Sequence, residues 1–288
     1  VIGGSPSILR LFEGIRLASQ TPGNRSVLLV GETGVGKTHV AELLHKASER
    51  SGRPFKAVTA TATGGDVNMM RGEWIGYGRN HGVRDIPSMG RSGHLVEVDG
   101  GTLFVDEFDS LSPDLQGVFL SVLDGRPVQK VGGENVTPNV RCVFATNADL
   151  DDAVRTGRLR RDLLARIGPR IAIDPLKAHR GDVVALAMRF LPDGRTLSAA
   201  CKLVLLNHEW PTNVRELRRA IDLAVGRAGD GVAQIDASHL DLPATATAVV
   251  RGMNEEQCTE ALRRLAQDIA RSEGFEVDAG LQHRVAEI

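Results

Sequence analysis

The chain has 288 residues, of which 42% are hydrophobic and 25% charged, and its formal net charge is -1 at pH 7. These values are ordinary for a globular protein with a proper core, and they exclude wholesale disorder and a bulk electrostatic attraction to nucleic acid. The distant cysteines Cys142, Cys201 and Cys258 exclude a disulfide scaffold and a CxxC zinc site, and they indicate a reducing compartment.

Short apolar runs rich in β-branched residues alternate with helical patterns through the first part of the chain. We expect helices at residues 38–47 and 114–123, and strands at residues 26–30, 55–58, 102–105, 140–145 and 170–173. Strands that alternate with helices are typical of a parallel sheet with helices on both faces. The sequence therefore predicts an α/β domain over residues 1–176.

The pattern changes after Pro175, where helical periodicity continues and no good strand follows. Helices expected at residues 182–190, 198–207 and 213–227 predict a small all-α domain over residues 177–242. Residues 242–250 are small and featureless, which favours a linker, and residues 254–272 form an amphipathic helical pattern. We expect residues 243–288 to be a linker followed by this helical segment.

The most specific motif lies where the first strand meets the first helix. It matches G-x-x-x-x-G-K-[ST] and consists of Gly31, Glu32, Thr33, Gly34, Val35, Gly36, Lys37 and Thr38. Glycines let backbone N–H groups turn inward onto phosphate oxygens, and the following helix presents its positive N-terminus. Lys37 would reach the β- and γ-phosphates, and Thr38 would ligate Mg²⁺. A plain glycine-rich turn is the alternative, and the strand–loop–helix context favours ATP or ADP with Mg²⁺.

A second motif is an apolar strand that ends in Asp106 and Glu107. Such a strand places both carboxylates at the carboxyl edge of the sheet, where ligands bind in open α/β folds. We expect Asp106 to hold the Mg²⁺ shell, partly through water, and Glu107 to orient and deprotonate the attacking water. A solvated strand end is the alternative for a carboxylate pair taken alone.

The two motifs together resemble those of AAA+ ATPases, and more narrowly the central domain of sigma-54-dependent enhancer-binding proteins. The resemblance covers roughly residues 1–242 and rests on strings in the family's order: Ile2-Gly3, residues 31–38, DGGTLFVDE at 99–107, VGG at 131–133, ATN at 145–147, LRRDLLAR at 159–166 and WPTNVREL at 210–217. It implies a P-loop AAA+ three-layer parallel-sheet domain followed by a small all-α lid. It also implies Mg-dependent ATP hydrolysis and a ring, in this family usually a hexamer.

The resemblance assigns nucleotide contacts by matched position. Ile2 and Gly3 resemble the family's opening and are carried over as cofactor-binding residues. Asn147 would sense the γ-phosphate, and its alternative is an asparagine that closes a turn at a strand end. Arg215 resembles the lid arginine that contacts bound nucleotide, and its alternative is a surface pair on the helix.

Arg160 and Arg166 resemble arginines that reach into the neighbouring subunit's site. A guanidinium there adds positive charge to the phosphoryl-transfer transition state. The alternative is a basic helix face that pairs with Asp162. Because the segment 157–170 is rich in arginine, the sequence leaves open which one acts.

The chain departs from the family pattern at several places. The stretch 74–87, WIGYGRNHGVRDIP, lacks the string G-A-F-T-G-A with which the family contacts sigma-54. Thr59 replaces the asparagine that in relatives holds the catalytic glutamate, so we expect control of Glu107 to be looser or to use other contacts. Thr212 replaces a glycine.

The preferred hypothesis is a ring-forming ATPase that remodels a protein partner in sigma-54-type transcription regulation. The altered loop keeps two alternatives open: a AAA+ ATPase with another client, and a nucleotide-gated switch that does not hydrolyse. A clamp-loader-like role on DNA is disfavoured by the neutral charge. Arg263, Arg264 and Arg271 indicate a solvated helix face rather than a DNA reader, so DNA contact would need a domain outside this chain.

No apolar run approaches the roughly 20 residues that span a bilayer, and no signal peptide follows Val1. We therefore expect a cytoplasmic protein without a membrane partner. We also expect the chain to be a piece of a longer protein.

Overall fold

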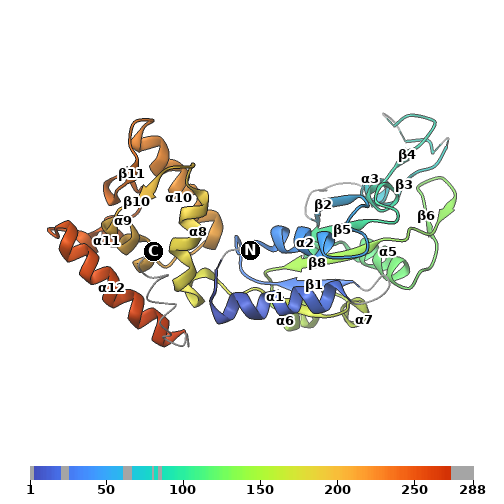
Figure 1. Ribbon diagram of the computed structural model, residues 1–288. Helices are drawn as coiled ribbons and strands as arrows, with labels where there is room; N and C mark the ends of the chain where they lie inside the picture. Colours follow the sequence, from blue (N-terminus) through green and yellow to red (C-terminus); the bar gives the residue numbers. More distant parts are fainter. Residues whose placement is uncertain (1–2, 21–25, 61–66, 80, 84–85, 274–288) are drawn as a thin grey trace. The chain divides into compact units, whose positions relative to one another are not determined.

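The computed structural model describes residues 3–20, 26–60, 67–79, 81–83 and 86–273 (Figure 1). The chain divides into two compact units. The sheet unit contains Glu13–Gly31 and Lys37–Ile173, and the helical unit contains Val1–Phe12, Glu32–Gly36 and Asp174–Ile288. The middle of the phosphate loop is therefore counted with the helical unit, although both of its ends belong to the sheet unit.

The sheet unit is built on a five-stranded parallel sheet in the order β2-β5-β8-β1-β9. Its strands are β1 (Val27–Val30), β2 (Phe55–Thr59), β5 (Thr102–Asp106), β8 (Arg141–Thr146) and β9 (Arg170–Ala172). All five predicted strands are present, with ends that differ by at most one residue. The central strands are almost wholly buried, which is why they read as continuous apolar runs in the sequence.

Helices cover both faces of this sheet, as Figure 1 shows for α2 on one side and for α6 and α7 on the other. Their bounds are α2 (Lys37–Lys46), α3 (Val67–Trp74), α4 (His94–Glu97), α5 (Pro113–Leu123), α6 (Leu150–Arg155) and α7 (Arg161–Arg166). One apolar core joins α5, α6 and α7 to the sheet through buried residues such as Phe119, Leu163 and Phe144. The α/β prediction is confirmed. The helix α1 (Pro6–Ser19) begins in the helical unit and ends in the sheet unit.

Two short hairpins that the sequence did not predict extend the sheet unit. They are β3 (Gly76–Tyr77) with β4 (Arg91–Ser92), and β6 (Val128–Gln129) with β7 (Asn135–Val136). The hairpins meet where Gly78 N–H donates to Val131 O at 2.9 Å and Val131 N–H donates to Gly76 O at 3.0 Å. A Cβ at Gly78 would lie 2.2 Å from Gly133 Cα, so only glycine allows this crossing. Two-residue strands are too short to leave a periodic pattern.

The helical unit contains the predicted helices around its own apolar core. They are α8 (Val183–Phe190), α9 (Ala199–Asn207), α10 (Asn213–Ala228) and α12 (Glu255–Ser272), with 3₁₀ turns at Leu176–Ala178, Arg180–Asp182 and Ala237–His239. One small addition to the predicted all-α pattern is a parallel pair of two-residue strands, β10 (Thr196–Leu197) and β11 (Gln234–Ile235).

The segment expected to be a featureless linker is helical. It forms α11 (Ala244–Thr247) and a 3₁₀ turn at Ala248–Val250. Leu242, Ala246 and Val250 pack on the core of the helical unit, so tertiary contacts give order to a stretch whose local signals were weak. Ile269 of α12 is buried in the same core.

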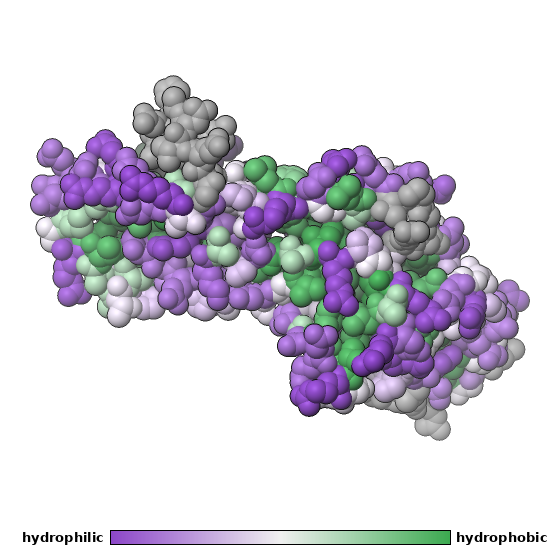
Figure 2. Space-filling model, turned by 90° about the horizontal axis from the view of Figure 1, so that it is seen from below, coloured by the Kyte–Doolittle hydropathy of each residue, from purple (hydrophilic) through white to green (hydrophobic). Residues whose placement is uncertain are grey.

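None of the helices in the described part of the chain combines the length and apolarity that crossing a bilayer requires. Figure 2 shows hydrophilic and hydrophobic residues interspersed on the face that it presents. The most exposed large hydrophobic side chain among the described residues is Met89, between β3 and β4, at 72%.

Candidate nucleotide-binding site

The predicted catalytic residues of the sheet unit gather at one edge of the sheet. Because the strands are parallel, their carboxyl ends meet at the same edge. The phosphate loop follows β1, Asp106 ends β5, and Asn147 follows β8, which lies between β1 and β5. Thr59 ends β2 and is the register partner of Asp106. Strand order thus places Asn147 between the phosphate loop and the acidic pair.

The phosphate loop has the backbone that its glycines predict. Gly34 and Gly36 have φ values of 81° and 99°, in the left-handed region that disfavours other residues. Lys37 is 8% exposed, and its Nζ donates to Gly31 O at 2.9 Å. Thr38 is exposed in the first turn of α2. The lysine therefore folds back over the loop, where its ammonium group would meet phosphate oxygens.

Glu107 has an unusual backbone for its residue type. Its φ of 52° and ψ of 41° are left-handed, and its N–H donates to Asp106 Oδ1 at 3.0 Å. Non-glycine residues in this region carry strain of about 1–3 kcal/mol, and such strain clusters at functional sites. Asp106 is half-buried and Glu107 is exposed. The turn therefore directs two adjacent carboxylates into different environments.

The turn after β8 is fixed by residues that the sequence reasoning missed. The buried Thr146 hydroxyl donates to Asp109 Oδ1, and it accepts from Ala148 N–H at 2.9 Å. Asp109 follows the acidic pair closely, in the turn Phe108–Ser110. This bond ties the end of β8, just before Asn147, to the turn that carries Glu107. A polar pair 37 residues apart leaves no local signal in the sequence.

The donor set at this edge fits Mg²⁺. Within the described ranges no group of three or more His, Cys, Asp or Glu side chains could hold a metal ion by itself. Mg²⁺ is seldom caged by protein alone; it keeps several waters and takes one or two carboxylates together with substrate phosphates. The hydroxyl of Thr38 and the carboxylate of Asp106 are donors of this kind.

Both candidate arginine fingers lie in exposed ion pairs. Arg160 binds Asp162 through two hydrogen bonds of 3.0 and 2.8 Å, which is the pairing that the sequence offered as the alternative to a finger. Arg166 Nε donates to Asp124 Oδ1 at 2.7 Å. Each pair raises the pKa of its arginine, chiefly through the hydrogen bond to the carboxylate. Exposed pairs of this kind contribute only about 0–1 kcal/mol, so they exchange readily for phosphate oxygens.

Arg166 lies at the opposite end of the sheet from the phosphate loop of its own chain. Gly168 N–H donates to Ser26 O at 3.1 Å, just before β1 begins, whereas the phosphate loop follows the last residue of β1. The strand between them rises about 3.3 Å per residue. This placement favours a site on another subunit for Arg166.

In the helical unit the opening segment and the lid arginine have defined partners. Ile2 lies outside the described residues. The N–H group of Gly4, the neighbour of Gly3, donates to Asp182 Oδ1 at 2.9 Å. Burial raises the pKa of Asp182, but hydrogen bonds from His179, Ser5 and Gly4 outweigh burial and hold it below its ordinary value. The contact of Asp182 with Gly4 and Ser5 was also missed by the sequence reasoning.

Arg215 is exposed near the start of α10, and its backbone N–H donates to Gly34 O at 3.3 Å. Glu216, the next residue on the helix, accepts from His208 Nε2 at 2.8 Å and from Thr212 N–H at 3.0 Å. Thr212 has a φ of -110°, so the residue that replaces the family's glycine fits without strain. The backbone of this segment therefore touches the phosphate loop directly.

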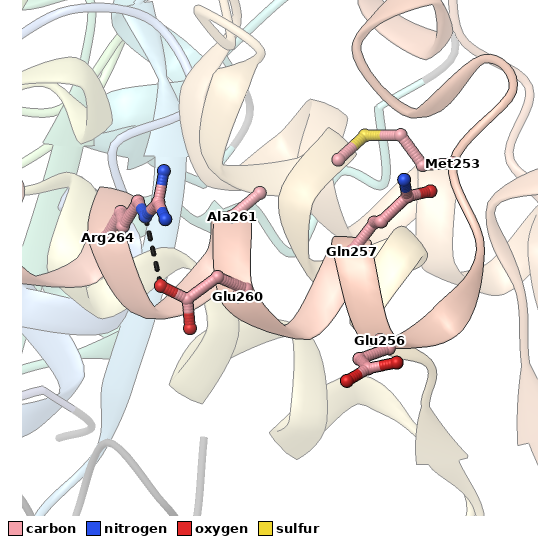
Figure 3. A pocket seen from close by; sticks show the side chains of 6 residues that line it. All are labelled: Met253, Glu256, Gln257, Glu260, Ala261 and Arg264. Carbon is pink, nitrogen blue, oxygen red and sulfur yellow. Dashed lines mark hydrogen bonds and ion pairs between the residues drawn. The ribbon is translucent and has the colours of Figure 1, made fainter.

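A hollow on α12 is a poor alternative site. Figure 3 shows its lining side chains, Met253, Glu256, Gln257, Glu260, Ala261 and Arg264. Glu260 and Arg264 are joined by a 3.0 Å bond within one helix. Glu260 and Arg264 thus satisfy each other rather than point at a ligand, so the sheet edge remains the candidate site.

The architecture has close counterparts among solved structures. Two crystal structures of NtrX from Brucella abortus match the whole of this chain. The ADP complex is matched over 69% of its chain with a TM-score of 0.74, and the ATP complex over 68% of its chain with a TM-score of 0.71. Sequence identities are 23% and 25%. The fold and the residues at the sheet edge define a P-loop AAA+ domain with a helical lid.

The chain belongs to the sigma-54 interaction domain family, whose model matches residues 1–172. It is 34% identical over 240 residues to the Nif-specific regulatory protein of Azotobacter vinelandii. The matched region covers 80% of this chain and 45% of that protein. It is 36% identical over 258 residues to the anaerobic nitric oxide reductase transcription regulator NorR of Salmonella dublin, covering 84% and 50%. The chain spans about half the length of the curated relatives it matches.

Proposed function

We propose that this chain is an ATP-binding and ATP-hydrolysing domain that assembles into a ring and remodels a protein partner in sigma-54-type transcription regulation. The observation that carries the proposal is the meeting of the phosphate loop, Asp106–Glu107 and Asn147 at one sheet edge. Family membership supports it, as do relatives that are themselves transcription regulators. Regulators of this kind act where bacterial DNA lies, so we place the protein in the cytoplasm.

The proposed reaction is attack of water on the γ-phosphorus of ATP. Glu107 accepts a proton from the water as its oxygen bonds to phosphorus, and the bond from phosphorus to the bridging oxygen of ADP breaks. Lys37 and the loop N–H groups bind the β- and γ-phosphate oxygens, and Asn147 donates to the γ-phosphate. Mg²⁺, held by Thr38 and Asp106, supplies charge neutralisation when bound. Arg215 of the lid adds a contact to the nucleotide.

Replacing Lys37 with alanine is expected to weaken ATP binding by about thirtyfold or more, because a buried charged hydrogen bond to phosphate is worth about 2 kcal/mol or more. Titration of a fluorescent ATP analogue measures the loss. Lys46→Ala is the matched control, since it removes the same charge from the exposed last residue of α2. Equal affinities for both variants would contradict the assignment of the phosphate loop.

The identity of the client depends on the β3–β4 hairpin, which stands in place of the family's contact loop. The β3–β4 hairpin persists and is tied to Val131, yet its sequence lacks G-A-F-T-G-A. This difference favours a second candidate function, an AAA+ ATPase with a client other than sigma-54. The aromatic residue at the start of the hairpin, Tyr77, is 4% exposed and so contributes to packing rather than to a contact surface.

Gel filtration with purified sigma-54, ADP and aluminium fluoride separates the two candidates. We expect co-elution of a stable complex, because the rest of the family's domain is retained. If the ring assembles and traps nucleotide but elutes without sigma-54, the second candidate function, with a client other than sigma-54, is favoured. A Gly78→Ala variant, which cannot form the crossing of the two hairpins, is then expected to lose whichever client binds.

A further inference from the structure

The side-chain amide of Asn213 joins three segments of the helical unit. Asn213 is the first residue of α10, is 1% exposed and has a φ of 55°. Its Oδ1 accepts from Leu176 N–H at 2.7 Å. Its Nδ2 donates to Glu32 Oε2 and to Thr33 O, both at 3.1 Å. One amide therefore links the entry to the helical unit, the start of α10 and the phosphate loop.

The neighbours of Asn213 extend this contact along the loop. A Cβ at Gly34 would lie 2.1 Å from Thr212 O, so the carbonyl group packs directly against the glycine. Arg215 N–H donates to Gly34 O at 3.3 Å. Residues 32, 33 and 34 of the loop are each touched by the segment 212–215. Gly34 is thus required by the start of α10 as well as by its own backbone angle.

Glu32 is held as a carboxylate in this arrangement. The hydrogen bond from Asn213 lowers its pKa most, burial opposes this, and the positive charge of Lys177 at 3.4 Å lowers it further. A charged Glu32 is a strong acceptor for the amide N–H of Asn213. The bond between the loop and α10 is therefore charge-assisted.

Asparagine is the residue type that this position needs. Its short amide tolerates the left-handed backbone and offers one acceptor for Leu176 and two donors for the loop. An aspartate would keep the shape and the bond to Leu176 but would set a second carboxylate against Glu32. Burial makes such a conflict costly, because the new carboxylate cannot turn to water.

We propose that Asn213 is a positioning residue for nucleotide binding, which with Glu32 fixes residues 32–34 of the phosphate loop to the start of α10. The loop is then held ready for phosphate, and Arg215 is carried in register with it. The inference rests on the proposed function, since it assigns a residue to the same nucleotide site. Its effect falls on affinity more than on chemistry, because Asn213 contacts the loop rather than the reacting atoms.

The test is a rescue experiment with Asn213→Asp, Glu32→Gln and the double variant. Asn213→Asp is expected to raise the Kd of a fluorescent ATP analogue about ten- to a hundredfold, because the new carboxylate at the buried position 213 would face the carboxylate of the exposed Glu32. In the double variant the amide introduced by Glu32→Gln can donate to the new carboxylate, so most of the affinity returns. The turnover number at saturating ATP is expected to change less than threefold or so in Asn213→Asp, in line with loss of binding alone.

Matched controls and a second variant keep the test decisive. Asn254→Asp adds the same charge at the N-cap of α12, where aspartate serves as well as asparagine, and Glu256→Gln removes an exposed carboxylate shown in Figure 3. Both are expected to bind nucleotide normally. Asn213→Gly, which keeps the left-handed backbone and removes the amide, replaces Asn213→Asp if that variant shows no cooperative thermal transition.

Wild-type affinity in Asn213→Asp or Asn213→Gly would overturn the inference. So would an Asn213→Asp defect of unchanged size in the double variant, because the defect would then not run through Glu32. These outcomes leave ATP binding by the wild type intact. A wild-type protein that binds no ATP would instead overturn the proposed function, and this inference with it.

Discussion

The Glu107→Gln variant is expected to bind ATP like the wild type and to lose multiple-turnover hydrolysis by about 10²- to 10⁴-fold, the usual contribution of a general base. Glutamine preserves the size of the side chain and its capacity to accept hydrogen bonds, but its amide cannot take a proton from water. Glu107 stands at the end of β5 in a left-handed turn, beside the carboxylate of Asp106. Among the residues that the structure describes, Glu107 is the only Asp or Glu with a positive φ.

Phosphate release under multiple turnover and titration of a fluorescent ATP analogue measure the two halves of this result. Glu49→Gln is the control, because it makes the same chemical change at an exposed position of the sheet unit. Undiminished hydrolysis in Glu107→Gln would remove Glu107 from the role of base. Nucleotide binding without hydrolysis in the wild type itself would support the switch hypothesis over the enzyme.

We propose that Thr59 sets how tightly that base is controlled. Thr59 is the register partner of Asp106. By resemblance, relatives have an asparagine at this position, and that asparagine holds the catalytic glutamate. Threonine has a single hydroxyl and a shorter side chain, so it offers fewer hydrogen bonds over a shorter distance. In the sequence, Thr59 was named only through the resemblance, and the pairing of β2 with β5 puts it at the sheet edge.

Residues of the site were predictable where their signal is local in the chain. The phosphate loop is one contiguous string. Asp106, Glu107 and Asn147 come at the ends of apolar runs, and these runs predict buried strands and therefore the position of the sheet edge. Gly34 was predicted as a loop glycine, but the carbonyl of Thr212 that also demands it comes from far along the chain. Local pattern thus finds the residues that would touch phosphate.

Residues that act through others could not be predicted from the sequence. Asp182 holds Gly4 across a separation of 178 residues, and Asn213 holds Glu32 across 181. Neither pair has a spacing or a periodicity that reports a contact, and an asparagine at the start of a helix is ordinary as a cap. The helical segment at 244–250 was missed for the same reason, because packing against a core formed elsewhere orders it. The sequence shows which side chains can form hydrogen bonds, but it does not show which distant residue each of them contacts.

The Arg160→Ala and Arg166→Ala variants are expected to keep ATP binding, and at least one of them is expected to lose about 10³- to 10⁵-fold in hydrolysis, the range found for arginine fingers. The ion pairs that hold these side chains are exposed, with side-chain exposures of 47% and 46% for Arg160–Asp162 and 39% and 22% for Arg166–Asp124. Breaking them therefore costs the fold little. Arg155→Ala, which removes a still more exposed ion pair with Asp152 on α6, is the control.

Mixing two inactive variants tests whether the arginine acts on a neighbouring subunit. A finger-deficient subunit has an intact Glu107, and a Glu107→Gln subunit has intact arginines, so a head-to-tail interface of the right order rebuilds a complete site. Equal mixing is expected to restore hydrolysis at about a quarter of the interfaces. The wild-type rate per subunit should likewise fall on dilution as the ring dissociates. A flat rate on dilution to monomers, with no recovery on mixing, would mean that the site is complete within one chain, and Arg160 and Arg166 would then act in their own subunit or only on its surface.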